Sequence, residues 1–213
     1  MESEDVPVVV YDASVLFPFQ VAHLLIFMAS ARLVRAHWTV EIEREWVERS
    51  LQKLGGLERA SVERRRDNMN AAVPDAKVSG YEHRIEGIAF PDPDDRHVVA
   101  AALECGAGCI VTNDRTDFNE TSLAPYGMRR VSPDALLCER HEALPELMVE
   151  VADSARRSLT KSRPGWRSYL DVLSRSGLPA FAASLRERVI EASADEPSDS
   201  LANPVPGGYT KLS

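Results

Sequence analysis

Three carboxylates lie in a single turn of this sequence, and they are the first residues that could do chemistry. The stretch begins Pro91-Asp92-Pro93-Asp94-Asp95 and continues with small and apolar residues, without a helix breaker before Gly106. Asp94 or Asp95 stands where the N-cap of the following helix is expected, and Asp-Pro-Asp is also ordinary turn chemistry. A cap needs only one carboxylate, however, and a divalent cation is a common means of offsetting the repulsion among three. The turn by itself leaves both interpretations open.

Further acids follow two short apolar runs that are typical of buried strands. Residues 8–11 lead directly to Asp12, and residues 109–112 lead to Asn113, Asp114 and Asp117. In an open α/β sheet, ligands bind at the carboxyl ends of the strands. Asp12 could instead cap the next helix, and the second group could be an Asn/Asp-rich turn. If the metal interpretation holds, these acids and the acidic turn meet at one edge of a sheet.

A helix expected over residues 39–54 adds another source of carboxylates. Thr39 is a favourable N-cap for this helix, and Gly55-Gly56 stop it. Most of its glutamates belong to a solvated face. Glu45 follows Ile42 by three positions and lies near the buried edge, so it is the best candidate to point inward.

The acids selected from these elements form one candidate constellation: Asp12, Glu45, Asp95, Asp114 and Asp117. Carboxylate oxygens favour Mg²⁺ or Mn²⁺ over zinc, and the sequence has no His/Cys cluster with zinc-ligand spacing. Such an ion can position and deprotonate a water and stabilise the leaving oxygen of a phosphodiester. This chemistry needs no protein nucleophile, and the sequence has neither a GxSxG elbow nor a P-loop. Ser14 and Thr112 are expected to hydrogen-bond to the ligand or to its water.

The alternation of strands and helices predicts βαβ units and a parallel sheet in the first two thirds of the chain. Strands are expected over residues 8–11, 109–112 and 128–131, and residues 33–38 are either a strand or a connector. Helices are expected over residues 15–32 (with Pro18 in the first turn), 39–54, 57–72 and 95–105, and another helix opens at 132–134. From residue 142 onward the composition favours helices alone, over residues 144–159, 166–174 and 179–192. We therefore expect an α/β domain at residues 6–138, a helical appendage at 139–192 and a disordered tail at 193–213.

Composition excludes several classes of protein. The 213 residues are 44% hydrophobic and 27% charged, as in ordinary globular proteins. The net charge of −8 argues against a protein that coats nucleic acid non-specifically, but not against a nuclease whose carboxylates bind cations. No apolar run approaches the roughly 20 residues that cross a bilayer, and the acidic N-terminus is unlike a signal peptide. The three cysteines form no CxxC pair, which indicates reduced thiols in a cytoplasmic protein.

A basic segment, residues 156–167, interrupts this acidic composition within the helical appendage. It contains no acidic residue. Its cationic side chains are Arg156, Arg157, Lys161, Arg163 and Arg167. Cations at the C-terminal end of a helix interact favourably with the helix dipole, and contact with RNA is an equal alternative.

Four stretches of the sequence resemble the ordered motifs of the PIN-domain family: residues 8–16, 37–45, 92–102 and 110–118. The resemblance covers roughly residues 8–137 and is specific because all four motifs occur in the right order. It implies a three-layer α/β/α fold around a mostly parallel sheet. It also implies a Mg²⁺- or Mn²⁺-dependent ribonuclease, often the toxin half of a VapC-type toxin–antitoxin pair. The helical appendage is not part of the minimal domain of that family.

The resemblance also assigns roles to residues of this chain. Asp12, Glu45, Asp95 and Asp117 match the acidic positions of the family. Asn113 matches a polar position that often follows the fourth-motif strand, and Asp114 is a candidate fifth acid that competes with Asp117.

We predict a metal-dependent endoribonuclease that hydrolyses RNA phosphodiester bonds and is the toxin of a type II toxin–antitoxin pair. Asp12, Asp95 and either Asp114 or Asp117 would hold the metal, and Glu45 would complete the site. Arg96 or the basic segment would hold the RNA backbone. The family resemblance further implies a homodimer and a cognate antitoxin, which would present a basic side chain to the acidic pocket.

Two other functions compete with this prediction. A phosphatase of the haloacid-dehalogenase type also places an Asp after its first strand, but its motif requires a second Asp where this chain has Ser14. A non-catalytic RNA- or partner-binding PIN-like module would keep the acidic pocket without cleaving anything.

Overall fold

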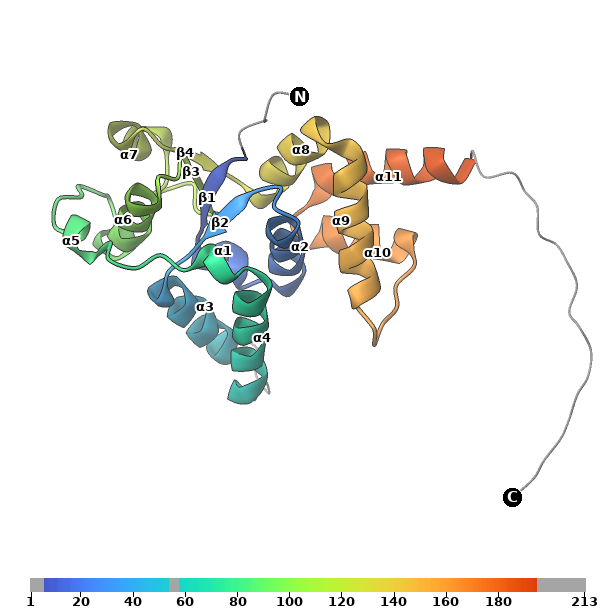
Figure 1. The fold of residues 1–213 in the computed structure, drawn as a ribbon, viewed down its shortest axis with the longest axis horizontal. Coiled ribbons are helices and arrows are strands. Elements are labelled where there is room, and N and C mark those ends of the chain that lie inside the picture. Colours follow the sequence, from blue (N-terminus) through green and yellow to red (C-terminus); the bar gives the residue numbers. More distant parts are fainter. Residues whose placement is uncertain (1–5, 54–57, 195–213) are drawn as a thin grey trace, which may run out of the picture.

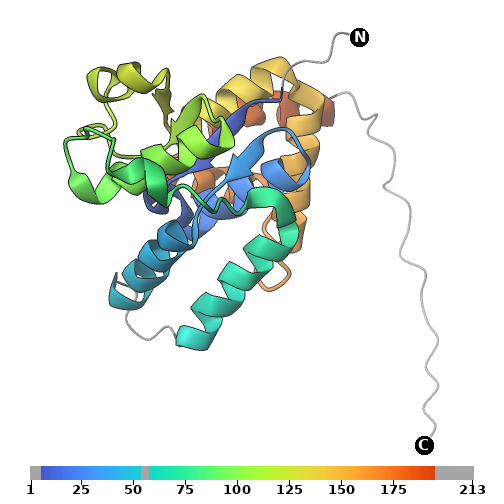
Figure 2. The same cartoon turned by 60° about the vertical axis from the view of Figure 1, so that its left-hand side comes forward.

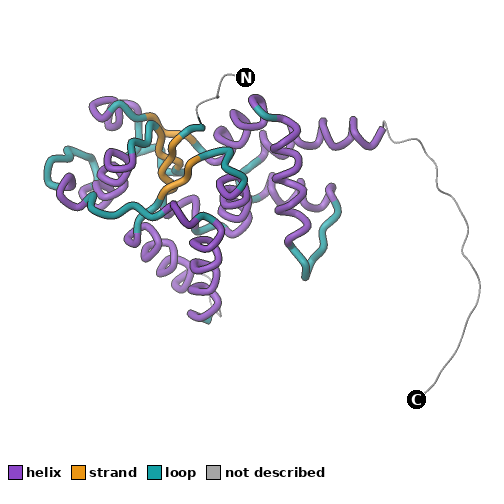
Figure 3. Tube along the Cα trace, viewed as in Figure 1, coloured by secondary structure: helices purple, strands orange, loops and turns teal. Residues whose placement is uncertain are grey.

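A four-stranded, all-parallel sheet forms the centre of the protein. The computed structural model describes residues 6–53 and 58–194. The strands are β1 (Val8–Tyr11), β2 (Arg35–His37), β3 (Cys109–Val111) and β4 (Arg129–Val131), in the spatial order β2-β1-β3-β4. Figure 3 shows the strands gathered at the centre, with helices around them. The predicted α/β class with a parallel sheet is therefore confirmed, and the stretch 33–38 contains a strand.

Helices make up most of the rest of the described chain and lie close to their predicted positions. The first half contains α1 (Ala13–Leu16), α2 (Phe19–Ser30), α3 (Val40–Lys53), α4 (Arg59–Ala72), the 3-10 turn η1 (Pro74–Ala76) and α5 (Glu82–Ile85). Next come η2 (Pro93–Asp95), α6 (Arg96–Cys105), α7 (Glu120–Leu123) and η3 (Ala124–Tyr126). The C-terminal helices are α8 (Pro133–Ala143), α9 (Pro145–Ser158), α10 (Trp166–Arg175) and α11 (Pro179–Ala194).

The prediction of a single helix over residues 15–32 is wrong. The structure contains two helices instead, because Pro18 takes an extended backbone conformation with ψ at 119° and serves as the N-cap of α2. Proline also lacks the N–H that a continuous helix would use at this position. The short helix α1 consequently stands alone between β1 and α2.

The sheet lies between α6 on one face and α2 on the other (Figure 1). Val9 and Val10 of β1 point to opposite faces, and both are completely buried. This double covering explains why the strands read as continuous apolar runs rather than as alternating ones. Tyr11 anchors α2 to the sheet, because its hydroxyl donates to the Leu25 carbonyl at 3.3 Å.

The C-terminal helices pack on the α/β core rather than standing apart from it (Figure 2). α9 lies against α2, and α11 contacts both α8 and α10. Asp134 of α8 caps α11, since its carboxylate accepts hydrogen bonds from the backbone N–H groups of Ala180 (3.0 Å) and Phe181 (2.9 Å). The buried apolar residues of both parts form one hydrophobic cluster. The expected division between residues 138 and 139 falls inside α8.

Two further sequence expectations concern the ends of the chain and the membrane. The expected tail at 193–213 lies outside the described residues, apart from the last two residues of α11. Within the described ranges, no helix combines the length and the apolar character that a bilayer crossing requires.

The C-terminal end of α6 has a left-handed backbone conformation that a substitution can test. Gly106 adopts the left-handed conformation (φ 69°, ψ 30°), and its N–H donates to the Ala102 carbonyl. A Cβ at this position would meet no atom within 4 Å, so Gly106→Ala would cost only conformational energy, about 1 kcal/mol. Urea unfolding should show this loss for Gly106→Ala. The matched control Gly108→Ala also adds its Cβ to open space but has no positive φ, so equal losses in both variants would contradict the assignment.

Candidate active site

The carboxyl ends of β1 and β3 place the first site residues side by side. Tyr11 pairs with Val111 in the parallel register, so Asp12 and Thr112 leave neighbouring strands at the same level. Asp12 is 7% exposed and is the N-cap of α1, where its side chain accepts from the Ser14 N–H at 3.2 Å. The helix-cap interpretation of Asp12 is therefore correct. It does not exclude a second role for the same carboxylate.

Hydroxyl groups hold the Asp12 carboxylate in a fixed orientation. The Thr112 hydroxyl donates to Asp12 Oδ2 at 2.7 Å. Because this hydrogen bond uses the only proton of the Thr112 hydroxyl, the Ser14 hydroxyl is the donor in its own 3.2 Å contact with Thr112 Oγ1. Ser14 Oγ in turn accepts from the Asn113 N–H at 3.1 Å. Both hydrogen bonds to Asp12 use Oδ2, and within the described residues no donor contacts Oδ1. Asp12 thus presents one oxygen that is free for a ligand.

The acidic turn brings two more carboxylates to this edge. Three carboxylates each place one oxygen within 4.8 Å of the other two, which is close enough to bind a single ion: those of Asp92, Asp95 and Asp117. Asp92 caps the turn η2 by accepting from the Asp94 N–H at 2.9 Å. Asp95 occupies the N-cap position of α6 but makes no capping hydrogen bond. The cap and the acidic group thus both exist in this turn, and Asp92 belongs to both.

Asp92 is a candidate ligand that the sequence analysis did not select. The sequence did contain an indication of this role, because Asp92 belongs to the turn with three carboxylates. Two residues separate Asp92 from Asp95, and the tight turn of η2 between them brings both carboxylates to the same group.

Burial and mutual repulsion dominate the electrostatics of this group. Burial, together with the charges of Asp12, Asp92, Asp114 and Asp117, raises the pKa of Asp95 to about 7. Desolvation and the neighbouring charges of Asp114 and Asp92 also raise the pKa of Asp117. A cation at this position would relieve the repulsion, and the donor atoms are carboxylate oxygens, which suit Mg²⁺ or Mn²⁺. The residues therefore fit the metal that the sequence predicts.

Asp114 and Asp117 differ in what they contact. Asp114 Oδ1 accepts from the N–H groups of Thr116 (2.7 Å) and Asp117 (3.1 Å), and the Asp114 N–H donates to Thr112 Oγ1 at 3.0 Å. Asp114 therefore shapes the loop after β3. Asp117, which that loop positions, belongs to the three-carboxylate group.

Glu45 approaches the site from α3 but is not in the three-carboxylate group. Its Oε1 lies 3.0 Å from Nε2 of the buried His97 on α6. Burial alone would lower the pKa of His97, but the hydrogen-bonding and charge effects of Glu45, with the charges of Glu41 and Asp95, raise it. The sequence analysis gave no indication of this contact.

Glu43, not Glu45, is the most deeply buried glutamate of α3. Glu43 is 6% exposed, accepts from Trp38 Nε1 at 3.0 Å and pairs with Lys77. These two partners compensate for the burial of the charge. The expectation that Glu45 is the inward-pointing glutamate of this helix is therefore wrong, because Glu43 is buried while the Glu45 side chain keeps 35% of its surface exposed.

The basic side chains of residues 156–167 differ in the contacts that they make within the protein. Arg156 pairs with Asp153 at 2.6 Å, donates to the Pro164 carbonyl at 2.8 Å and lies over the Trp166 ring at 5.1 Å. These contacts fix the loop between α9 and α10. Arg157 also pairs with Asp153, at 2.6 Å.

The other predicted RNA contacts lie at the surface or beside the acidic turn. Lys161, Arg163 and Arg167 are exposed. Arg163 Nε donates to the Thr160 carbonyl at 3.3 Å. Arg96 is partly buried at the start of α6, and its Nε has no hydrogen-bond partner among the described residues.

Comparison with known proteins gives information on the C-terminal part of the chain. Residues 133–187, which run from the start of α8 into α11, match the family model described as the VapC50 C-terminal domain. A search of curated proteins and a search of solved structures found no significant match. The matched segment contains none of the acidic residues at the sheet edge: Asp12, Glu45, Asp92, Asp95, Asp114 and Asp117. Through its C-terminal helices, the chain is similar to VapC-type toxins.

Proposed function

We propose that this protein is a metal-dependent endoribonuclease and the toxin of a type II toxin–antitoxin pair. The observation that carries the proposal is the convergence of Asp92, Asp95 and Asp117 beside Asp12, at the carboxyl edge of a parallel sheet. The similarity of the C-terminal helices to a VapC-type toxin supports the same class.

In this proposal the carboxylates hold Mg²⁺ or Mn²⁺, which supplies a Lewis acid for the activation of water and the stabilisation of the leaving oxygen. Asp92, Asp95 and Asp117 would bind the ion, and Oδ1 of Asp12, which has no hydrogen-bond donor among the described residues, would be available to a ligand. Ser14 and Thr112 keep Asp12 oriented, while Asp114 positions Asp117 through the loop. His97 holds Glu45 near the edge, where its carboxylate can accept a proton.

The proposal extends to partners and location. RNA is the substrate, and a cognate antitoxin covers the acidic edge with a basic side chain in a cytoplasmic complex. A homodimer is the proposed assembly of the toxin. The α/β part, residues 6–138, carries the nuclease site, and the helices that follow extend it.

The first test is cleavage of a mixed RNA pool in Mg²⁺, in Mn²⁺ and in EDTA. Asp12→Asn and Asp95→Asn should each reduce cleavage by more than about 100-fold, because each removes a charge from the metal-binding edge. Asp94→Asn is the matched control, since Asp94 lies in the same turn but outside the three-carboxylate group. Full activity of Asp12→Asn would rule out the site. Folded wild type that binds Mn²⁺ but cleaves no RNA would favour the non-catalytic module.

A second test uses the pH dependence of stability without metal. The pKa of Asp95 lies at about 7, above its ordinary value of 3.8, so the folded protein binds this proton more tightly than the unfolded chain does. The resulting stabilisation is complete below pH 3.8 and is lost progressively between pH 3.8 and about 7. In EDTA, Asp95→Asn should therefore unfold about 2–4 °C above wild type at pH 8, roughly 1 kcal/mol after solvent screening, and the difference should shrink as the pH falls below 7 and be small at about pH 4. A variant that is less stable at both pH values would mean that Asp95 has a structural role.

A third test concerns the exposed cations of the basic segment. In an Asp12→Asn background, which prevents cleavage, Lys161→Ala combined with Arg167→Ala should weaken binding of single-stranded RNA. The slope of log affinity against log salt should fall by about 1.4, because each lost phosphate contact removes about 0.7. Arg44→Ala is the control, since Arg44 is also exposed but is paired with Glu41 on α3. An unchanged slope in the double variant would remove the basic segment from the RNA interface.

A further inference from the structure

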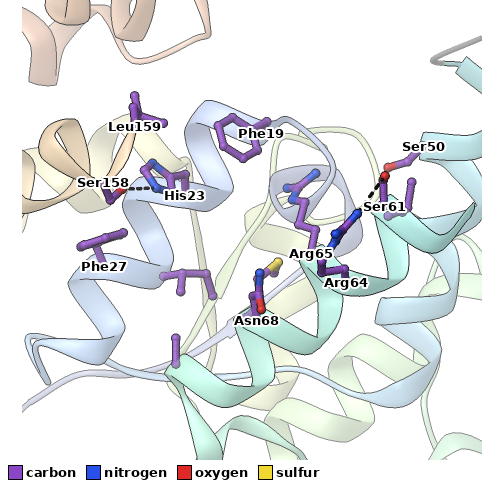
Figure 4. A pocket seen from close by; sticks show the side chains of 14 residues that line it. Phe19, His23, Phe27, Ser50, Ser61, Arg64, Arg65, Asn68, Ser158 and Leu159 are labelled. Atoms are coloured by element: carbon purple, nitrogen blue, oxygen red, sulfur yellow. Dashed lines mark hydrogen bonds between the residues drawn. The ribbon is translucent and has the colours of Figure 1, made fainter. Parts of the chain in front are cut away.

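A cavity of about 700 Å³ lies between α2, α4 and the C-terminal end of α9, away from the acidic edge. Figure 4 shows residues of α2 and α9 on one side of it and residues of α4 on the other. Its apolar walls are formed by Phe19, Ile26, Phe27, Val62, Met69 and Leu159. A cavity of this size with mainly apolar walls and a few polar groups is typical of small-molecule sites.

Arg65 places a positive charge in this cavity without an acidic partner. Its guanidinium donates to the carbonyls of Leu16 (2.5 Å) and Phe17 (3.1 Å) and lies over the rings of Trp46 (4.7 Å) and Phe19 (5.5 Å). The carbonyls satisfy two of its five donors but carry no net charge. Among the described residues, no carboxylate forms an ion pair with Arg65, and burial lowers its pKa to about 10. Arg65 is partly buried, and charges that are withdrawn from water are ordinarily paired, so the cavity is suited to an anion.

A neutral histidine adds hydrogen-bonding capacity opposite Arg65. His23 lies between Phe19 and Phe27, with ring centroids at 5.2 and 5.0 Å, and its Nε2 is 2.9 Å from the Ser158 hydroxyl. Its other ring nitrogen, Nδ1, is buried without a partner. Burial, with a smaller effect of Arg65, lowers the pKa of His23 to about 4. The ring is therefore neutral at physiological pH. The cations that line the cavity are Arg65 and Arg64, and Arg64 is exposed and donates to Ser61 Oγ at 3.3 Å.

We propose that this cavity binds a small amphipathic monoanion, which has an aromatic or branched apolar body and one carboxylate or sulfonate group. The anionic group pairs with Arg65, and the body packs against Phe19, Phe27 and Leu159. Phe19 is 47% exposed without a ligand, which leaves apolar surface for the ligand to cover. A nucleic acid does not fit these walls, because its affinity depends on many phosphate contacts, whereas the cavity is lined by only two cations, Arg64 and the partly buried Arg65.

The test is a fluorescence titration of the full chain with 8-anilinonaphthalene-1-sulfonate, an aromatic monoanion, and with the neutral analogue N-phenyl-1-naphthylamine. The anion should bind at one saturable site and at least tenfold more tightly than the neutral analogue. Arg65→Met should abolish that preference. Arg66→Met is the matched control: Arg66 neighbours Arg65 on α4 but pairs with Asp67 and does not line the cavity. Equal binding of the two probes by wild type would overturn the proposal, as would an unchanged preference in Arg65→Met.

A second variant covers the case in which Arg65→Met does not fold. Asn68 is exposed and lines the cavity, so Asn68→Trp should fill part of the space without loss of the fold and should weaken binding of the anion at least tenfold. Near-UV circular dichroism checks the fold of each variant. Unchanged binding by Asn68→Trp would place the probe elsewhere and overturn the proposal. If light scattering shows a dimer that Asn68→Trp converts to a monomer, a second copy of the chain occupies the cavity and the proposal is wrong. None of these measurements depends on nuclease activity.

Discussion

Asp12 and Thr112 leave β1 and β3 at the same level because the parallel register pairs Tyr11 with Val111. The rest of the acidic edge depends on this pairing. Thr112 orients Asp12 directly and also accepts the N–H of Asp114, whose carboxylate positions the N–H of Asp117. A shift of one residue between the strands would separate Asp12 from Thr112 and from the two acids in the loop after β3. The register is in turn secured by complete burial of Val10 and Ile110, which a slip would turn toward the opposite face.

The parts of the site that the sequence predicted follow from short-range patterns. Continuous apolar runs identify buried parallel strands, so β1 and β3, and the acids that follow them, could be located from the sequence. Side-chain partners across the fold could not. Nothing in the local pattern of α3 shows that Trp38 and Lys77 would compensate for the burial of Glu43, or that His97 would meet Glu45. The role of Arg156 in its loop likewise depends on Trp166, ten residues further along the chain.

The C-terminal helices illustrate the difference between a sequence segment and a structural unit. Composition changes near residue 142, and the family match begins at residue 133. The carboxylate of Asp134 caps α11, and α9 packs on α2 within one hydrophobic cluster. Removal of these helices would therefore expose a face of α2 that is now buried. Their contribution to stability is expected to be cooperative with that of the sheet.

The helix α1 connects the acidic edge to the rest of the fold. It has only four residues, too few for an isolated helix to be stable in water. Its N-terminal end is capped by Asp12, and the carbonyls of Leu16 and Phe17 at its C-terminal end accept hydrogen bonds from Arg65 of α4. The cap fixes the Asp12 side chain only while α1 keeps its position. The geometry of Asp12 therefore depends on α4, although none of the carboxylates at the acidic edge belongs to α4.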